Sequence, residues 1–231
     1  GDSCGGSRVA ATLAFAREIG IGDRRSHGDR ERVVAWTRGG PDIILCGGES
    51  RRMGRPKAWL PFGSEYVLQR IVRVVAQAAS PIVLATRHGM DLPPLSSEFE
   101  TVYDEPGVGG PLAGIAAGMI ALRGKCDAAL VAACDHPFVS AAVFHRMIEL
   151  LGDNSAVVPE LTGGLFPTLA VYRLSTLKVL EEMLRNGELR AQEFALNCNP
   201  LRIGEANLAD IDADLQSFCN MNNPAEYEAA L

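Results

Sequence analysis

Two adjacent glycines and a cluster of cations lie in the stretch "LCGGESRRMGRPK", residues 45–57. Adjacent glycines let backbone N–H groups approach a ligand closely, and cations offset phosphate charge. The cations here are Arg51, Arg52, Arg55 and Lys57. The stretch has neither the Gly-Lys-Ser/Thr of a P-loop nor the G-x-G-x-x-G dinucleotide fingerprint. Charge alone therefore does not decide between a phosphate-binding loop and a solvated basic turn.

A second chemically capable group is the segment "CDHPF", in which Asp135 directly follows an apolar run. Open α/β sheets bind ligands at the carboxyl ends of their strands, so this position suits a ligand contact. Mg²⁺ is typically held by one or two carboxylates and keeps several waters. Asp135 could instead cap the turn before Pro137. We do not expect zinc at Cys134 and His136, because alternate residues of one strand end seldom converge on one ion.

The elements that must position these residues follow from hydrophobic patterning. Strands are predicted at 42–46, 81–86, 100–104, 127–134, 156–160 and 168–172, and helices at 66–79, 111–122, 140–151 and 176–186. Ser175 is the expected N-cap of the last of these helices, and Asn223-Pro224 is a typical helix start. Strands alternating with helices predict a single doubly wound α/β domain, with a mostly parallel sheet flanked by helices.

Composition narrows the class of protein. The chain has 231 residues, 47% of them hydrophobic, and a net charge of −6, which argues against a nucleic-acid partner. No apolar run is long enough for a membrane span, and we find no convincing signal peptide. The six cysteines are spread widely without C-x-x-C pairs, so reduced thiols and a cytoplasmic location are expected.

Residues 1–40 differ from the rest of the chain. They hold seven arginines, no lysine and no strand-like alternation. We expect a poorly ordered N-terminal extension there and a folded domain over residues 41–231.

The residue order of the glycine loop closely resembles L-A-G-G-x-S-x-R-M-G-x-x-K of the molybdenum cofactor guanylyltransferases (MobA type), within the wider nucleotidyltransferase family. Four further segments resemble that family, in its order: "DEPGVGGPLAGI", "CDHPFV", "FPTLAVY" and "NMNNPAEYEAA". Together the five segments extend over roughly residues 42–231. The resemblance implies a Rossmann-like fold of the nucleotidyltransferase type.

The same resemblance implies transfer of GMP from GTP to the terminal phosphate of molybdopterin, with release of pyrophosphate and Mg²⁺ as cofactor. The substrate supplies its own nucleophilic oxygen, so catalysis would depend on alignment and charge neutralisation. The implied partners are GTP and molybdopterin. The resemblance also leaves room for contacts with cofactor-biosynthesis or molybdoenzyme-maturation proteins.

Carried over position by position, the resemblance implies catalytic roles for Arg52, Lys57 and Asp135, with Asp135 as the metal ligand. The implied GTP contacts are Leu45, Cys46, Gly47, Lys57, Asp104 and Asp135, and the implied substrate-proximal residues are Gly48, Gly110, Pro111, Asn220 and Asn222. Three of these assignments have alternatives. Asp104 could be a second metal ligand. Asn220 and Asn222 lie beside a helix cap, and the glycines of "PLAGIAAG" could serve helix–sheet packing.

Some residues depart from the family pattern. Cys46 replaces the usual alanine, and we interpret it as a packing residue. Ala85 lies where many relatives have asparagine, Asn223 replaces a threonine, and Phe166 replaces a more polar residue. Alternative functions are a molybdenum cofactor cytidylyltransferase or another nucleotidyltransferase, and a non-catalytic nucleotide-binding domain. "CGG" and "PLAG" favour guanine, while Lys57 and Asp135 favour catalysis.

Overall fold

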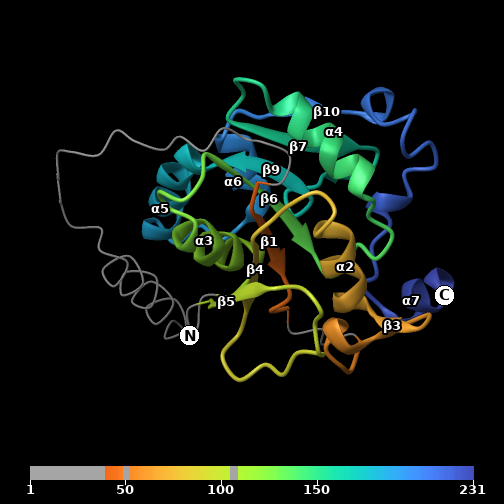
Figure 1. Cartoon of the computed structure of the whole chain (residues 1–231). Helices are drawn as coiled ribbons and strands as arrows, with labels where there is room; N and C mark the ends of the chain where they lie inside the picture. Colours follow the sequence, from red (N-terminus) through yellow and green to blue (C-terminus); the bar gives the residue numbers. More distant parts are fainter. Residues whose placement is uncertain (1–39, 49–52, 105–108) are drawn as a thin grey trace, which may run out of the picture.

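The computed structural model describes residues 40–48, 53–104 and 109–231. Its main sheet has eight strands in the order β10-β7-β9-β6-β1-β4-β5, with β8 paired to β7 (Figure 1). Its strands are β1 (Asp42–Leu45), β4 (Ile82–Thr86), β5 (Phe99–Tyr103), β6 (Ala128–Ala133), β7 (Ala156–Leu161), β8 (Gly164–Leu165), β9 (Ala170–Arg173) and β10 (Leu201–Ile203). A separate hairpin is formed by β2 (Pro61–Phe62) and β3 (Glu65–Tyr66).

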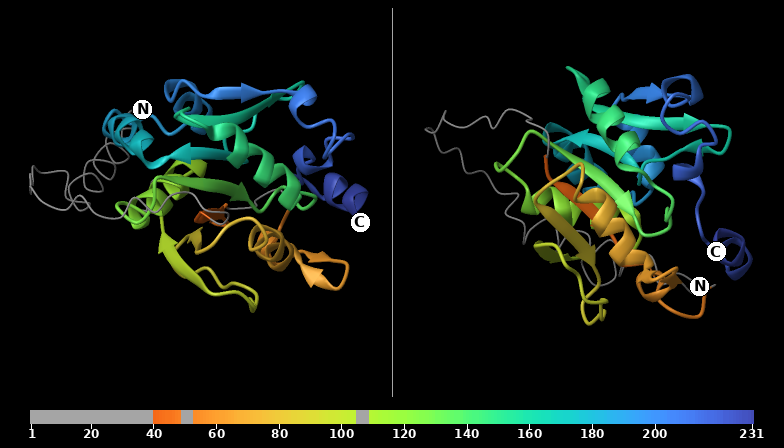
Figure 2. Two further views of the ribbon diagram at one scale, coloured as in Figure 1. Left: turned by 45° about the horizontal axis from the view of Figure 1, so that its top comes forward. Right: turned by 45° about the vertical axis from the view of Figure 1, so that its right-hand side comes forward.

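The described helices are α2 (Val67–Val75), α3 (Pro111–Ala121), α4 (Ala141–Leu151), α5 (Leu177–Arg185), α6 (Ala191–Asn197) and α7 (Pro224–Ala230). Helices α2 and α4 cover one face of the sheet, and α3, α5 and α6 cover the other (Figures 1 and 2). The predicted doubly wound α/β fold is therefore confirmed. The sheet edge strand β10, the β2–β3 hairpin, β8 and α6 were not predicted from the sequence.

The directions of the strands determine which edge of the sheet can bind a ligand, because open α/β sheets bind ligands at the carboxyl ends of their strands. Strand β1 pairs in parallel with both β4 and β6, and Leu45 lies opposite Ala85 and Ala133. Strand β5 is parallel to β4 and β10 to β7, whereas β9 runs antiparallel to its neighbours β6 and β7. The carboxyl ends of β1, β4, β5, β6 and β7 consequently share one edge of the sheet.

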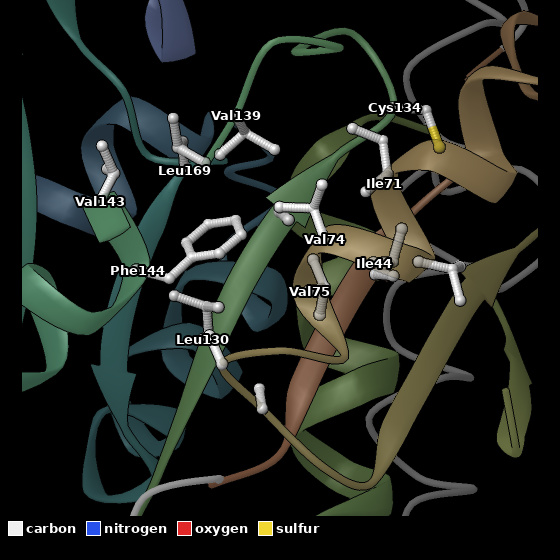
Figure 3. Close-up of a cluster of buried hydrophobic side chains, with 14 of the residues drawn as sticks. Ile44, Ile71, Val74, Val75, Leu130, Cys134, Val139, Val143, Phe144 and Leu169 are labelled. Atoms are coloured by element: carbon white, nitrogen blue, oxygen red, sulfur yellow. The ribbon is translucent and has the colours of Figure 1, made fainter. Parts of the chain in front are cut away.

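Apolar side chains fill both sides of the sheet. On the α2–α4 side, Phe144 packs with Ile44, Val75 and Leu130, all of them buried (Figure 3). The predicted apolar face of α2 lies in this cluster, because its valines and Ile71 point to the sheet. Burial of such side chains from water is the main favourable term in folding. The packing of these side chains fixes the positions of the strand ends.

Helix α3 lies unusually close to β1 because it carries glycines on the contact face. A Cβ atom added at Gly118 would stand 2.5 Å from Ile43 Cγ2, and one at Gly114 would stand 3.0 Å from Leu45 Cδ2. The packing role that the sequence left open for these glycines is confirmed. Both glycines face the strand that leads into the glycine loop.

The helix starts confirm two expectations and correct a third. The Ser140 hydroxyl accepts a hydrogen bond from Val143 N at 3.3 Å, and Asn223 Oδ1 accepts one from Glu226 N at 3.0 Å, so both are N-caps. The expected Ser175 cap is wrong. Leu174–Thr176 form a 3₁₀ turn instead, and α5 begins after Thr176.

The expected extension, residues 1–40, falls outside the described residues except for Gly40. The carbonyl of Gly40 accepts a hydrogen bond from Ser80 N at 2.9 Å, so the described chain begins attached to the sheet. In the part of the chain that the structure describes, no helix has the length and apolar character needed to cross a membrane.

Candidate active site

Lys57, Asp135 and Asn222 come from three distant segments and meet at the carboxyl edge of the sheet. Lys57 Nζ donates a hydrogen bond to Asn222 Oδ1 at 3.0 Å and lies 3.7 Å from Asp135 Oδ2. The backbone joins the last two segments, because Met221 N donates to the carbonyl of Asp135 at 2.9 Å. A cation, a carboxylate and an amide are thus held within contact of one another.

The position of Lys57 follows from a short 3₁₀ turn, η1 (Lys57–Trp59). Two apolar residues next to the lysine, Ala58 and Leu60, are buried in the core, and Leu60 N donates back to Lys57 O at 3.1 Å. Trp59 Nε1 donates to Asp91 O at 2.9 Å. These contacts anchor the chain directly after the lysine, and the lysine side chain is only 18% exposed.

Asp135 follows β6 and has one oxygen, Oδ1, that is buried and has no hydrogen-bond partner among the described residues. The nearby His136 Nε2 lies 3.6 Å from it. His136 is buried, and burial lowers its pKa, which favours the neutral imidazole over a cation that would neutralise Asp135. A carboxylate oxygen buried without a donor is costly unless something else binds it, and a metal ion would do so.

The single carboxylate of Asp135 suits Mg²⁺, which typically takes one or two carboxylate ligands and keeps several waters. Within residues 40–48, 53–104 and 109–231, no three His, Cys, Asp or Glu side chains gather as a possible metal site. An ion held there by Asp135 would complete its coordination with phosphate oxygens and water, which is the usual arrangement for Mg²⁺.

The described residues that follow β1, β4 and β5 lie on the side of the edge opposite to β7. Gly47 lies beside Arg87: an added Cβ would be 3.4 Å from Arg87 Cγ, an ordinary van der Waals contact. Asp104 N donates to Thr86 O at 3.0 Å, which fixes the start of the loop after β5. Burial raises the pKa of Asp104, while Arg87 acts in the opposite direction. This side therefore offers closely approachable backbone and a half-buried carboxyl group.

Asp104 and Asp135 follow strands three positions apart in the sheet. At the usual strand spacing this separates them by roughly 14 Å, too far for both carboxylates to hold one ion. This separation disfavours one ion shared by the two carboxylates, and the alternative of Asp104 as a second metal ligand stays a prediction.

Cys46 lies just beyond β1 and is 5% exposed, as expected of a packing residue. Its thiol donates to Ala85 O at 3.4 Å, and its N–H donates to the same carbonyl at 2.9 Å. The side chain of Ala85 is buried, and the interaction that Ala85 makes here is through its carbonyl, which accepts both hydrogen bonds from Cys46. The hydrogen bond with Cys46 and burial raise the pKa of the neighbouring Cys134 well above its usual value. That favours the protonated thiol over a reactive thiolate.

A cavity of about 580 Å³ opens on the β7 side of Asp135. Asp135, His136, Phe166, Gln192, Phe218 and Asn220 contribute to its lining. The ring of Phe166 makes edge contacts with Phe218, at a centroid distance of 5.1 Å, and with His136, at 5.9 Å. The cavity thus combines an aromatic wall with polar groups, which suits a flat, polar ring system.

The remaining predicted residues are placed as follows. Gly110 is the N-cap of α3 with φ +110°, and Pro111 is its first residue. A Cβ on Gly110 would lie 3.9 Å from Leu189 O. Leu189 is three residues before Gln192, which lines the cavity, so the start of α3 lies near the segment that leads to the cavity. Gly48 is exposed at the end of the described loop. Arg52 belongs to residues 49–52, which lie outside the described residues.

Sequence reasoning missed Gln192 and Glu226. Gln192 reaches the cavity from α6, a short helix that no strong pattern marks. Glu226 accepts a hydrogen bond from the N–H of Asn222 at 2.5 Å. The spacing Asn223-x-x-Glu226 is a capping-box signal that could have indicated it.

Comparison with known proteins agrees with this geometry. Residues 43–196 match the family model of the MobA-like NTP transferase domain. A probable molybdenum cofactor guanylyltransferase of Pelotomaculum thermopropionicum is 32% identical over 190 residues, covering 81% of this chain and 90% of that protein. The molybdenum cofactor guanylyltransferase of Desulfosudis oleivorans is 32% identical over 191 residues, covering 81% and 92%.

Among solved structures, molybdopterin-guanine dinucleotide biosynthesis protein A of Archaeoglobus fulgidus is similar, with a TM-score of 0.67 at 24% identity. The match covers 82% of this chain and 96% of that one. The 2-C-methyl-D-erythritol 4-phosphate cytidylyltransferase of Thermus thermophilus shares the fold, with a TM-score of 0.61 at 18% identity over 84% and 97% of the chains. The family match and the identity to these relatives show that the chain belongs to the MobA-like NTP transferases.

Proposed function

We propose that this protein transfers GMP from GTP to the terminal phosphate of molybdopterin, in a reaction that requires Mg²⁺. The observation that carries the proposal is the meeting of Lys57 and Asp135, 3.7 Å apart, between the glycine loop and the cavity. It is supported by the relatives named as molybdenum cofactor guanylyltransferases, which this chain matches over four fifths of its length.

In this reaction a phosphate oxygen of the acceptor attacks the α-phosphorus of GTP, and the bond to the bridging oxygen of pyrophosphate breaks. The attacking oxygen is already anionic, so no side chain needs to remove a proton. Bound Mg²⁺ would supply charge neutralisation at the phosphate oxygens. Asp135 would hold the ion through its buried Oδ1, and Lys57 would bind the triphosphate as a point charge. Arg52, by resemblance, would add a second cation.

The two substrates would lie on opposite sides of Asp135. The nucleotide would bind the loops after β1, β4 and β5, with Leu45, Cys46 and Gly47 offering backbone. Asp104 could accept hydrogen bonds from guanine, whose N1–H and amino group are adjacent donors. The acceptor would occupy the cavity near Asn220, with Gly110 and Pro111 at the neighbouring end of α3. Alignment of the reacting groups would then be the main catalytic contribution of the protein.

We place this reaction in the cytoplasm. The cysteines of the described residues are free thiols, and their spacing forms no disulfide framework. GTP and molybdopterin would be its small-molecule partners, and proteins of cofactor biosynthesis or molybdoenzyme maturation would deliver the acceptor or take up the product.

The test is a competition assay with purified protein, Mg²⁺, molybdopterin and each nucleoside triphosphate. We expect kcat/KM for GTP to exceed that for CTP by at least about a hundredfold, because cytosine leaves guanine-binding groups unpaired. EDTA should abolish turnover. Preferential use of CTP would replace the proposal by the cytidylyltransferase alternative. Nucleotide binding without any transfer would favour the non-catalytic domain.

A further inference from the structure

The carboxylate of Glu226 holds the turn that carries Asn222. Its Oε2 accepts a hydrogen bond from Asn222 N at 2.5 Å, and its Oε1 accepts one from Asn223 Nδ2 at 2.6 Å. Asn223 Oδ1 in return accepts from Glu226 N at 3.0 Å. Because an ionised acceptor makes stronger hydrogen bonds than a neutral one, this reciprocal set fixes the backbone direction at Asn222.

The helix that begins at this turn is attached to the segment that follows Lys57. Tyr227, the residue after Glu226, is 6% exposed, and its hydroxyl donates to Pro61 O at 2.5 Å. Helix α7 accordingly lies beside the β2–β3 hairpin (Figure 1). Pro61 is four residues after Lys57 in the chain. One short helix therefore fixes both ends of the contact between Lys57 and Asn222.

The contact itself limits the freedom of a long side chain. A long lysine side chain loses rotamer entropy when its position is fixed. Here the amide oxygen of Asn222, at 3.0 Å, holds the ammonium group 3.7 Å from Asp135 Oδ2. An asparagine on a loosely held turn could not hold the lysine in this way.

We propose that Glu226 is a positioning residue of the active site, which holds the backbone of Asn222 so that its side chain orients Lys57 toward the triphosphate. The inference rests on the proposed function, because it assigns Lys57 to GTP. The simpler role for Glu226 is to cap α7, and that role affects stability alone. The two roles differ in one respect: a positioning residue acts on GTP only while the side chain of Asn222 is present.

A double-mutant cycle on GTP affinity separates these roles, with the dissociation constant measured by calorimetry in the absence of acceptor. We expect Glu226→Ala to raise Kd for GTP roughly five- to twentyfold, since an exposed charge-assisted hydrogen bond is lost. In the Asn222→Ala background the same change should add less than about a twofold loss. Glu226→Gln keeps one acceptor for Asn222 N–H and should weaken binding less, again only when Asn222 is present.

The matched control is Glu228→Ala, which removes an exposed glutamate from the same helix without removing the cap. It should leave both GTP affinity and melting temperature unchanged. Equal losses for Glu226→Ala with and without Asn222, or a loss no larger than in Glu228→Ala, would overturn the proposal. Should the alanine variant fail to fold, the same comparison with Glu226→Gln decides. Wild-type protein that binds no GTP would refute the proposed function instead.

Discussion

Replacing Asp135 by Asn tests the metal site directly. Asparagine has nearly the same size, but it lacks the charge that would hold a cation at the buried Oδ1 position. We expect guanylyl transfer to fall by roughly two to three orders of magnitude, as for loss of one transition-state charge contact. Lys57→Ala should reduce turnover and also weaken GTP binding, because this charge acts on the ground state too.

The fold should survive the Asp135 substitution. Unit charges 3.7 Å apart attract by roughly 4 kcal/mol at an effective dielectric of about 20. The side chains of Lys57 and Asp135 are 18% and 27% exposed, so desolvation and screening reduce the net contribution to about 1 kcal/mol. Lys57 also keeps its hydrogen bond to Asn222. We therefore expect a shift in Tm of only a few degrees.

The sign of the effect on GTP binding distinguishes a metal ligand from a general structural role. Without Mg²⁺, Asp135 repels the triphosphate, so Asp135→Asn should bind GTP at least as tightly as wild type in EDTA. With Mg²⁺ the order should reverse, because only wild type can recruit the ion. The measurements are calorimetric titration of GTP with and without Mg²⁺, thermal melting and transfer rates. Near-normal turnover in a folded variant, or an unchanged response to Mg²⁺, would refute the metal assignment.

Two further predictions concern β1. Gly118→Ala should destabilise the protein by about 1–3 kcal/mol, because its Cβ would overlap Ile43. Gly114→Ala should be near neutral, because its Cβ meets only the end of the Leu45 side chain. Equal denaturant midpoints for the two variants would contradict this. Burial raises the pKa of Asp42 well above its usual value, so its ionisation costs stability as pH rises from about the unfolded value of 3.8 through the folded pKa. The free energy of unfolding of Asp42→Asn should therefore increase relative to that of wild type as pH rises. A difference between the two proteins that does not change with pH would contradict this prediction.

The centre of the parallel sheet could be predicted because its strands are almost wholly apolar. A strand buried on both faces reads as a continuous hydrophobic run, and β1, β4 and β6 have this pattern. The direction of β9 could not be predicted in the same way. Its sequence packs equally well in either orientation, and its antiparallel pairing with β6 and β7 depends on how the chain returns. Asp42 was also unexpected inside the core, since an aspartate that opens a strand usually faces water.

The candidate site divides in a similar way. Asp135 could be placed at the carboxyl edge because it follows an apolar strand, whereas Lys57, in the loop after β1, was assigned to the site through the family resemblance. For the asparagine segment the sequence allowed two roles, a substrate contact and a helix cap. The structure confirms the cap, and the substrate contact stays a prediction. Asn222 contacts Lys57 while Asn223 caps α7. Gln192 and the cavity depend on contacts between segments far apart in sequence, and no local pattern carries that information. Glu226, in contrast, contacts its sequence neighbours Asn222 and Asn223, and the capping-box spacing could have indicated it.

The antiparallel strand accounts for the room beside Asp135. Because β9 runs opposite to β6 and β7, its amino end lies at the edge where they end, so the chain enters β9 there through Phe166, Pro167 and Thr168. Its presence also sets β6 and β7 two strand spacings apart, or roughly 10 Å. The entering segment and the turn after β7 become walls of the cavity and leave space between them. On the side where we propose that the nucleotide binds, β1, β4 and β5 are adjacent parallel strands instead. The strand directions of the sheet thus give one edge two unlike halves, which suits the reaction proposed above, in which two different phosphate esters are joined.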